Sequence, residues 1–151
     1  RYTDVMLMRA EALIELNRLS EAENIVNDIR NRAAQSVDKH ISYAKDQCEI
    51  ALYPDNYFSN KEIARKCLRW ERRLEMAMEN GRFFDLRRWG IASETLNAYF
   101  ESEQHDVYEG QPYGQYYKDA HFTSGKNEFF PVPYNQMFYI PGLYTQNKGY
   151  E

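Results

Sequence analysis

The sequence predicts a mostly α-helical fold that ends in a long irregular segment. Apolar residues recur at helical spacing through most of residues 1–100. Residues 101–151 have no such period and carry eight of the 13 tyrosines. With 151 residues, 43% of them hydrophobic, the chain is long enough to bury one core without an obligatory metal or disulfide, and we do not expect a second complete domain.

The first expected element is a helical hairpin over residues 1–33. Its first helix has an apolar stripe at Val5, Met8, Ala12 and Leu16, widened by Leu7, Leu13 and Ile14. Because this helix opens at Arg1 without a capping residue, we expect the chain to be a piece of a longer protein.

The second helix of the hairpin follows Ser20 and Glu23, which have capping-box spacing. Its apolar stripe comprises Ala22, Ile25, Val26, Ile29 and Ala33. The short connection predicts antiparallel packing of the tetratricopeptide type. No second copy follows at the period of about 34 residues that is typical of tetratricopeptide arrays.

A loop over residues 34–58, with one helical turn near 45–52, separates the hairpin from a helical pair over residues 59–100. Ser59 and Glu62 have capping-box spacing. The next helix has the stripe Ile63, Cys67, Trp70, Leu74, Ala77 and Met78, and we expect Gly81 to end it. Helical spacing then resumes at Phe83, Leu86 and Trp89, is interrupted at Gly90, and continues at Ala92, Leu96 and Phe100.

Residues 101–151 are expected to form an irregular tail, because glycine and proline punctuate them throughout. The tail is rich in tyrosine and phenylalanine, which we expect to pack it against the helices. Irregular segments of this length are uncommon in compact domains unless they bind a ligand or lie on a scaffold.

Charge argues against a nucleic acid as the main partner. Residues 1–100 hold equal numbers of basic and acidic residues, the net charge of −4 arises in the tail, and no arginine follows Arg88. No apolar run approaches the length of about 20 residues that spans a bilayer. Cys48 and Cys67 stand outside any metal-binding spacing, which favours ordinary small apolar residues; a disulfide between them is the alternative in an oxidising compartment.

The densest polar cluster lies in residues 71–90. Glu71 and Glu75 are i, i+4 neighbours, so a catalytic carboxylate pair has to be considered. The surrounding arginines would keep both carboxylates ionised and favour a structural network instead. We expect this network, joining the third and fourth helices, to comprise Glu71, Arg72, Glu75, Asp85, Arg87 and Arg88.

No catalytic, metal or cofactor site is predicted. His40, His105 and His121 are far apart and none belongs to a metal-binding pair. The common nucleotide-binding, acyl-transfer and calcium-binding motifs do not occur in the sequence. We therefore expect a binding protein rather than an enzyme.

A tyrosine-rich loop is the candidate ligand site. Tyr108, Tyr113, Tyr116 and Tyr117 lie among glycine, proline and glutamine residues, and such rings can stack on the apolar faces of sugars. Of these we take Tyr113, Tyr116 and Tyr117 as the candidate ligand-binding residues. The alternative is that the rings only pack the tail against the helices.

Four ordered blocks resemble the C-terminal region of the SusD/RagB family, the surface glycan-binding lipoproteins of Bacteroidetes. Residues 1–12 are similar to the family's RYaDVlLmyAEAL helix, and residues 22–33 resemble its A…iN.vR.RA partner. Residues 71–90 are similar to ERR.El..EG.R..DL.RWG, and residues 130–133 with 146–150 resemble the closing PIP and QNpGY signatures. Lys148 stands where the family often has proline.

The resemblance implies that residues 1–151 are a SusD/RagB-like C-terminal domain with tetratricopeptide-like helical pairs. It also implies glycan binding at the surface of the outer membrane and delivery of the ligand to a TonB-dependent transporter of the SusC type. Membrane contact would then be made only through an N-terminal lipid anchor that lies outside this chain. The alternative is a tetratricopeptide-type protein-interaction module that binds no glycan.

Overall fold

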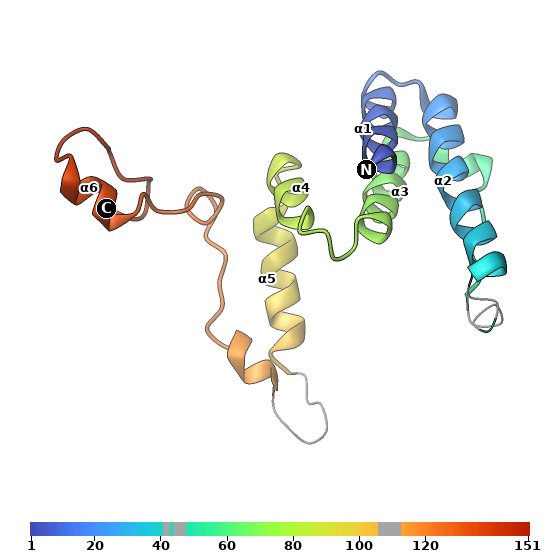
Figure 1. Cartoon of the computed structure of the whole chain (residues 1–151). Coiled ribbons are helices and arrows are strands. Elements are labelled where there is room, and N and C mark those ends of the chain that lie inside the picture. Colours follow the sequence, from blue (N-terminus) through green and yellow to red (C-terminus); the bar gives the residue numbers. More distant parts are fainter. Residues whose placement is uncertain (41–42, 44–47, 106–112) are drawn as a thin grey trace. The chain divides into compact units, whose positions relative to one another are not determined.

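A computed structural model of the chain describes residues 1–40, 43, 48–105 and 113–151 (Figure 1). Within these residues the regular elements are all helices, so the prediction of a mostly α-helical fold is confirmed. The structure divides into two compact units, Arg1–Asn80 and Gly81–Glu151, and each is described by itself.

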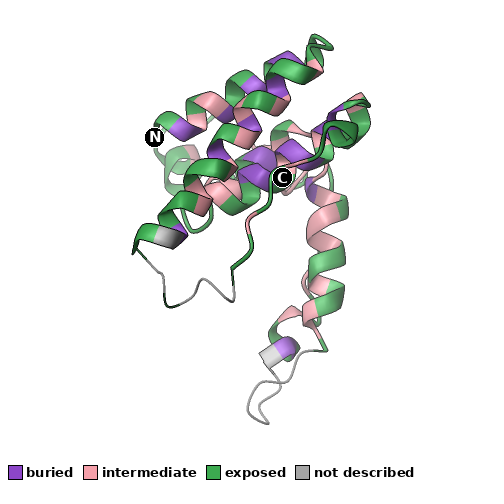
Figure 2. Cartoon of the chain, turned by 90° about the vertical axis from the view of Figure 1, so that its right-hand side faces the viewer, coloured by how far each residue is buried: buried purple, intermediate pink, exposed green. Residues whose placement is uncertain are grey.

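The first unit is a three-helix arrangement. Helix α1 (Tyr2–Glu15) and helix α2 (Leu19–His40) form the expected hairpin, and helix α3 (Lys61–Glu75) packs against both (Figure 1). A short 3-10 helix, η2 (Asp55–Phe58), precedes α3 and places the ring of Phe58 in the core. Buried residues recur along all three helices (Figure 2).

The core faces of two helices differ from the expected stripes. In α1 the side chains of Val5 and Met8 are 60% and 52% exposed, whereas Leu7, Ala10, Leu13 and Ile14 are buried. In α3 the expected Trp70 is half exposed, while Glu71 and Arg72 are buried. The expected stripes are therefore wrong at Val5, Met8 and Trp70, because apolar residues line more than one face and paired charges occupy part of the core. They are confirmed at Leu7, Leu13, Ile14 and Cys67. The stripe of α2, with Ala22, Val26 and Ile29 buried, is confirmed.

Two boundaries of α2 correct the prediction. The helix continues to His40 instead of ending near residue 33, because the buried Val37 lies one turn beyond Ala33 and extends the apolar stripe. At the other end Ser20 lies inside the first helical turn and is not its cap. The turn expected near 45–52 falls partly outside the described residues, since 44–47 are not among them.

The boundaries of α3 also differ from the expectation. Its cap is Asn60, whose side-chain Oδ1 accepts hydrogen bonds from the backbone N–H groups of Glu62 and Ile63 at 2.8 and 3.4 Å; Ser59 does not fill this role. The helix ends at Glu75, well before Gly81. Gly81 has φ −76° and caps the start of the next helix, so the expectation that it ends α3 is wrong.

The second unit contains helix α4 (Arg82–Arg88), helix α5 (Ala92–Glu103), the 3-10 helix η3 (Tyr113–Tyr117) and helix α6 (Tyr134–Tyr139). Gly90, with φ +70°, lies in the turn between α4 and α5, a conformation that favours glycine. The core of this unit is small: Leu86, Ala92 and Phe122 are buried in it. Most residues of α5 are intermediate or exposed (Figure 2).

Amide side chains hold the irregular segments through paired hydrogen bonds to backbone. Asn97 of α5 accepts from the backbone N–H of Phe122 at 2.7 Å and donates to its carbonyl oxygen at 3.0 Å. Gln146 does the same to Val132, at 2.7 and 3.1 Å. Residues 130–133 and 146–150, the two closing blocks of the sequence, thus bind each other. The expected aromatic packing of the tail is confirmed at Phe122 and Tyr117, whose rings contact Phe83 of α4 and Phe100 of α5, whereas Tyr134 of α6 is 76% exposed.

Candidate functional site

The charged side chains that the sequence predicts to be structural connect α3 to the hairpin. The buried Glu71 carboxylate accepts a hydrogen bond from Nη1 of Arg30 on α2 at 2.7 Å. The buried Arg72 donates a hydrogen bond through Nη1 to the carboxylate of Asp4 on α1 at 2.6 Å. Glu75 pairs with Arg1 and with Arg32 of α2. These charge-assisted bonds link segments that lie far apart in the sequence.

The sequence analysis named the residues of this network on α3 but not their partners on α1 and α2. Arg30 was not singled out, although its Nε also donates to the carbonyl oxygen of Ala51 at 2.6 Å and its guanidinium lies 4.5 Å from the ring centroid of Tyr53. Burial raises the pKa of Tyr53 to about 12. The signal in the sequence is the place of Arg30, directly after Ile29 of the apolar stripe, because an arginine that becomes buried there requires a partner.

In the second unit, Arg88 pairs with Asp85 at 3.0 Å within α4. The guanidinium of Arg87 lies over the rings of Phe83 and Phe129, at 5.7 and 5.4 Å from their centroids. Pairing between the third and fourth helices, which the sequence analysis expected, stays a prediction.

The three candidate tyrosines have different surroundings. The side chain of Tyr113 lies outside the described residues. Tyr116 is 76% exposed. The ring of Tyr117 stacks on Phe100 of α5 at 6.0 Å between centroids and 18° between planes, and it meets Tyr99 edge-on at 5.8 Å. Tyr117 therefore packs η3 against α5.

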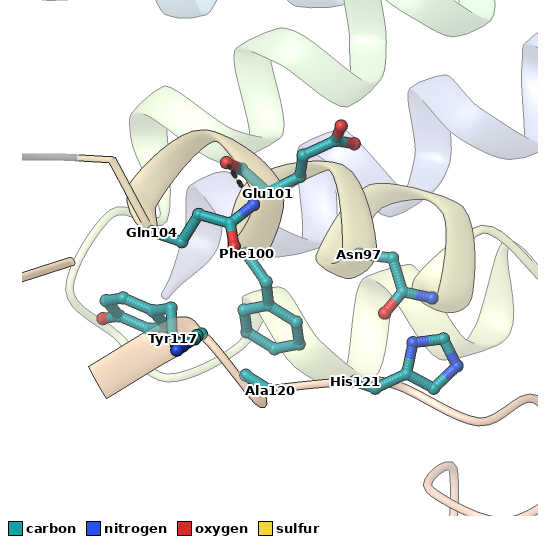
Figure 3. A pocket seen from close by; sticks show the side chains of 8 residues that line it. Asn97, Phe100, Glu101, Gln104, Tyr117, Ala120 and His121 are labelled. Atoms are coloured by element: carbon teal, nitrogen blue, oxygen red, sulfur yellow. Dashed lines mark hydrogen bonds between the residues drawn. The ribbon is translucent and has the colours of Figure 1, made fainter. Parts of the chain in front are cut away.

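A pocket of about 260 Å³ lies between α5 and residues 117–121, the end of η3 and the segment that follows it (Figure 3). Its lining combines two aromatic rings with amide, charged and imidazole groups: Asn97, Phe100, Glu101, Gln104, Tyr117, Lys118, Ala120 and His121. Of the candidate residues, the structure brings Tyr117 to this pocket. Phe100 and Gln104 were missed, since neither belongs to a motif and only the fold brings them beside Tyr117.

Contacts with the backbone of residues 103 and 122 fix the shape of this pocket. Asn97 holds Phe122 as described above, which sets the path of the chain at His121. Gly114 is buried where a Cβ atom would lie 2.2 Å from the carbonyl oxygen of Glu103, so only glycine allows η3 to approach the end of α5 this closely. The side-chain amide of Gln104 donates to the carbonyl oxygen of Glu101 at 3.2 Å (Figure 3).

Chemically, this pocket offers an apolar wall beside hydrogen-bonding groups of both kinds. Glu101 is an acceptor, Lys118 is a donor, and Gln104 is both. Aromatic faces with neighbouring amides suit polar ligands that also have apolar faces. Among the described residues no group of three potential ligand side chains could hold a metal ion.

The thiols of Cys48 and Cys67 are both free; Cys48 is exposed and Cys67 is buried. No helix within the described part of the chain is long and apolar enough to cross a membrane.

Comparison with known proteins places these features in a family. The sequence model of the SusD family matches residues 1–150. SusD-like protein P2 of Formosa agariphila is 26% identical to the chain over 153 residues. The alignment covers 99% of this chain and 25% of that protein, so the chain spans about a quarter of the relative's length.

Proposed function

This chain belongs to the SusD family, and we propose that it is part of a protein that binds glycan at the cell surface without catalysis. The observation that carries the proposal is the family match over residues 1–150. We further propose that the ligand passes to a TonB-dependent transporter of the SusC type, and that a lipid anchor upstream of this chain holds the protein on the outer membrane. A signal peptide ending in a lipid-modified cysteine, found upstream in the gene, would support the anchor.

Within this chain we propose the pocket beside Tyr117 as a glycan contact, with Tyr116 and Tyr113 on the same segment as further candidates. The stacked rings of Phe100 and Tyr117 supply an apolar surface for the C–H face of a sugar. Gln104 and Glu101 lie close enough to bond to hydroxyl groups of the same ligand. A volume of about 260 Å³ lies just below the roughly 300–1,000 Å³ of usual ligand pockets, so the pocket can hold only part of an oligosaccharide.

The test is a glycan array followed by calorimetry on the complete gene product. We expect Gln104→Ala to weaken binding of the best glycan by about tenfold with an unchanged melting temperature, because one or two hydrogen bonds are lost. The matched control is Gln136→Ala, an exposed glutamine of α6 outside this pocket, which should leave affinity unchanged. Equal affinity of parent and Gln104→Ala would remove the pocket from the glycan site.

We also expect the isolated 151-residue chain to bind the same glycan more weakly than the complete gene product. A small patch recovers little free energy after the cost of association. Equal affinity of the two proteins would contradict this expectation and assign the whole site to residues 1–151. Absence of binding to every glycan by the complete gene product would refute the proposed function itself.

A further inference from the structure

A second pocket, of about 480 Å³, lies in the second unit beside α4. Phe84, Arg87 and Arg88 of α4 line it together with Glu128 and Phe129 from the tail. The rings of Phe84 and Phe129 are 60% and 51% exposed. Two exposed aromatic rings that line one pocket form an apolar surface on which the C–H face of a pyranose ring can stack.

Two of the three charged side chains that line this pocket already bond to partners within the chain. The Arg88 guanidinium pairs with Asp85 at 3.0 Å. The Glu128 carboxylate accepts hydrogen bonds from the backbone N–H of Gly125 at 2.7 Å and from Oγ of Ser124 at 3.3 Å, so it fixes the turn in front of Phe129.

Arg87 is the third charged side chain that lines the pocket, and its N–H groups can donate hydrogen bonds to a ligand. Its guanidinium contacts the rings of Phe83 and Phe129, and in the part of the chain that the structure describes no carboxylate pairs with it. Aromatic contacts of this kind fix the position of a guanidinium without using its N–H donors in strong hydrogen bonds. Arg18, Arg30 and Arg65, in contrast, each donate to carboxylates.

We propose that this pocket binds an anionic sugar residue, one that carries a carboxylate or a sulfate group. The Arg87 guanidinium pairs with the anionic group through parallel N–H donors, and the rings of Phe84 and Phe129 support the sugar. The inference rests on the proposed function and makes it specific, because it assigns acidic glycans as the ligand class.

The probes are two matched pairs of oligosaccharides, each titrated into the complete gene product by calorimetry. One pair is an oligogalacturonide and the same oligosaccharide with its carboxyl groups reduced. The other is a sulfated galactan oligosaccharide and its desulfated form. We expect the acidic member of at least one pair to bind about tenfold or more tightly than its neutral partner, with a preference that declines as salt is added.

Arg87→Gln should remove that preference, so that the variant binds the acidic and the neutral partner with equal affinity. Arg87→Lys keeps the charge but loses the planar fork, so it should retain part of the preference and keeps the test informative if Arg87→Gln folds poorly. The matched control is Arg73→Gln, since the Arg73 guanidinium also lies over an aromatic ring, that of Trp70, but in α3. This control should behave like the parent.

Equal binding of acidic and neutral partners in both pairs overturns the inference and leaves glycan binding in place. A preference that survives in Arg87→Gln overturns it too, because the anion must then be held elsewhere. A complete gene product that binds no glycan on the array refutes the proposed function, and the inference with it.

Discussion

The buried ion pair between Arg30 and Glu71 gives the sharpest test of what holds the first unit together. The side chains are 16% and 6% exposed. Replacing Arg30 by Met keeps the aliphatic stem but leaves a buried carboxylate without the partner that the structure gives it. Breaking a buried pair in this way costs about 3–5 kcal/mol.

The same change removes the hydrogen bond to Ala51 and the contact with the ring of Tyr53, each worth about 1 kcal/mol, so we expect a total of about 5–7 kcal/mol. A domain of this size is stable by about 5–15 kcal/mol, and a loss of about 5–7 kcal/mol lowers its melting temperature by roughly 10–28 °C. Thermal and urea unfolding followed by circular dichroism measure both quantities.

Two further variants separate charge burial from lost packing. Adding Glu71→Met to Arg30→Met removes the stranded carboxylate, and this double variant should recover about 2 kcal/mol of the loss. The matched control is Arg18→Met, whose pair with Glu21 is about half exposed and should contribute far less to stability than the buried pair. If Arg30→Met costs no more than Arg18→Met, the ion pair does not stabilise the fold and the reasoning is refuted.

The remaining predictions concern three other features. Tyr117→Ala should destabilise the protein by about 1–2 kcal/mol and Tyr116→Ala by less than about 0.5 kcal/mol in melts, because Tyr117 packs on α5 and Tyr116 is exposed; equal losses would contradict this difference. Hydrogen bonds from Arg65 and Lys61 lower the pKa of Glu15 to about 2, so its contribution to stability is present above pH 4.5 and is lost as the pH falls toward 2. The difference in melting temperature between parent and Glu15→Gln, which is small because Glu15 is about half exposed, should disappear over that range. A thiol reagent should label Cys48 in the folded protein and Cys67 only after unfolding, because Cys67 is buried and burial raises its pKa; fast labelling of both thiols by mass spectrometry would disprove this.

The helices of the chain could be predicted where local signals agree. The stripe of α2 is apolar on one face, and the structure buries that face. In α3 the apolar residues and the buried face diverge, since the partners of Glu71 and Arg72 lie 41 and 68 residues away. Periodicity ranks charged residues as solvent-exposed, so it cannot find a core face that depends on distant counter-charges.

The tail could be predicted as irregular, but not how it is held. Asn97 and Gln146 fix their backbone partners from 25 and 14 residues away, and no local pattern marks an amide for that role. The candidate site was predictable to the same limited extent. Tyrosines among glycines and prolines pointed to residues 113–117, whereas Phe100 reaches Tyr117 only because Gly114 lets η3 approach α5.

The positions that carry the family resemblance mostly serve stability. Arg30, Glu71 and Arg72 hold the first unit, and Gln146 holds the closing segment. The pocket beside Tyr117 is lined by residues 97–104 and 117–121, which lie outside all the matching blocks. A family match built on stabilising positions therefore predicts the fold well and the ligand poorly. The ligand has to be established from variants of the pocket residues, since those can change without disturbing the ion pairs that hold the helices.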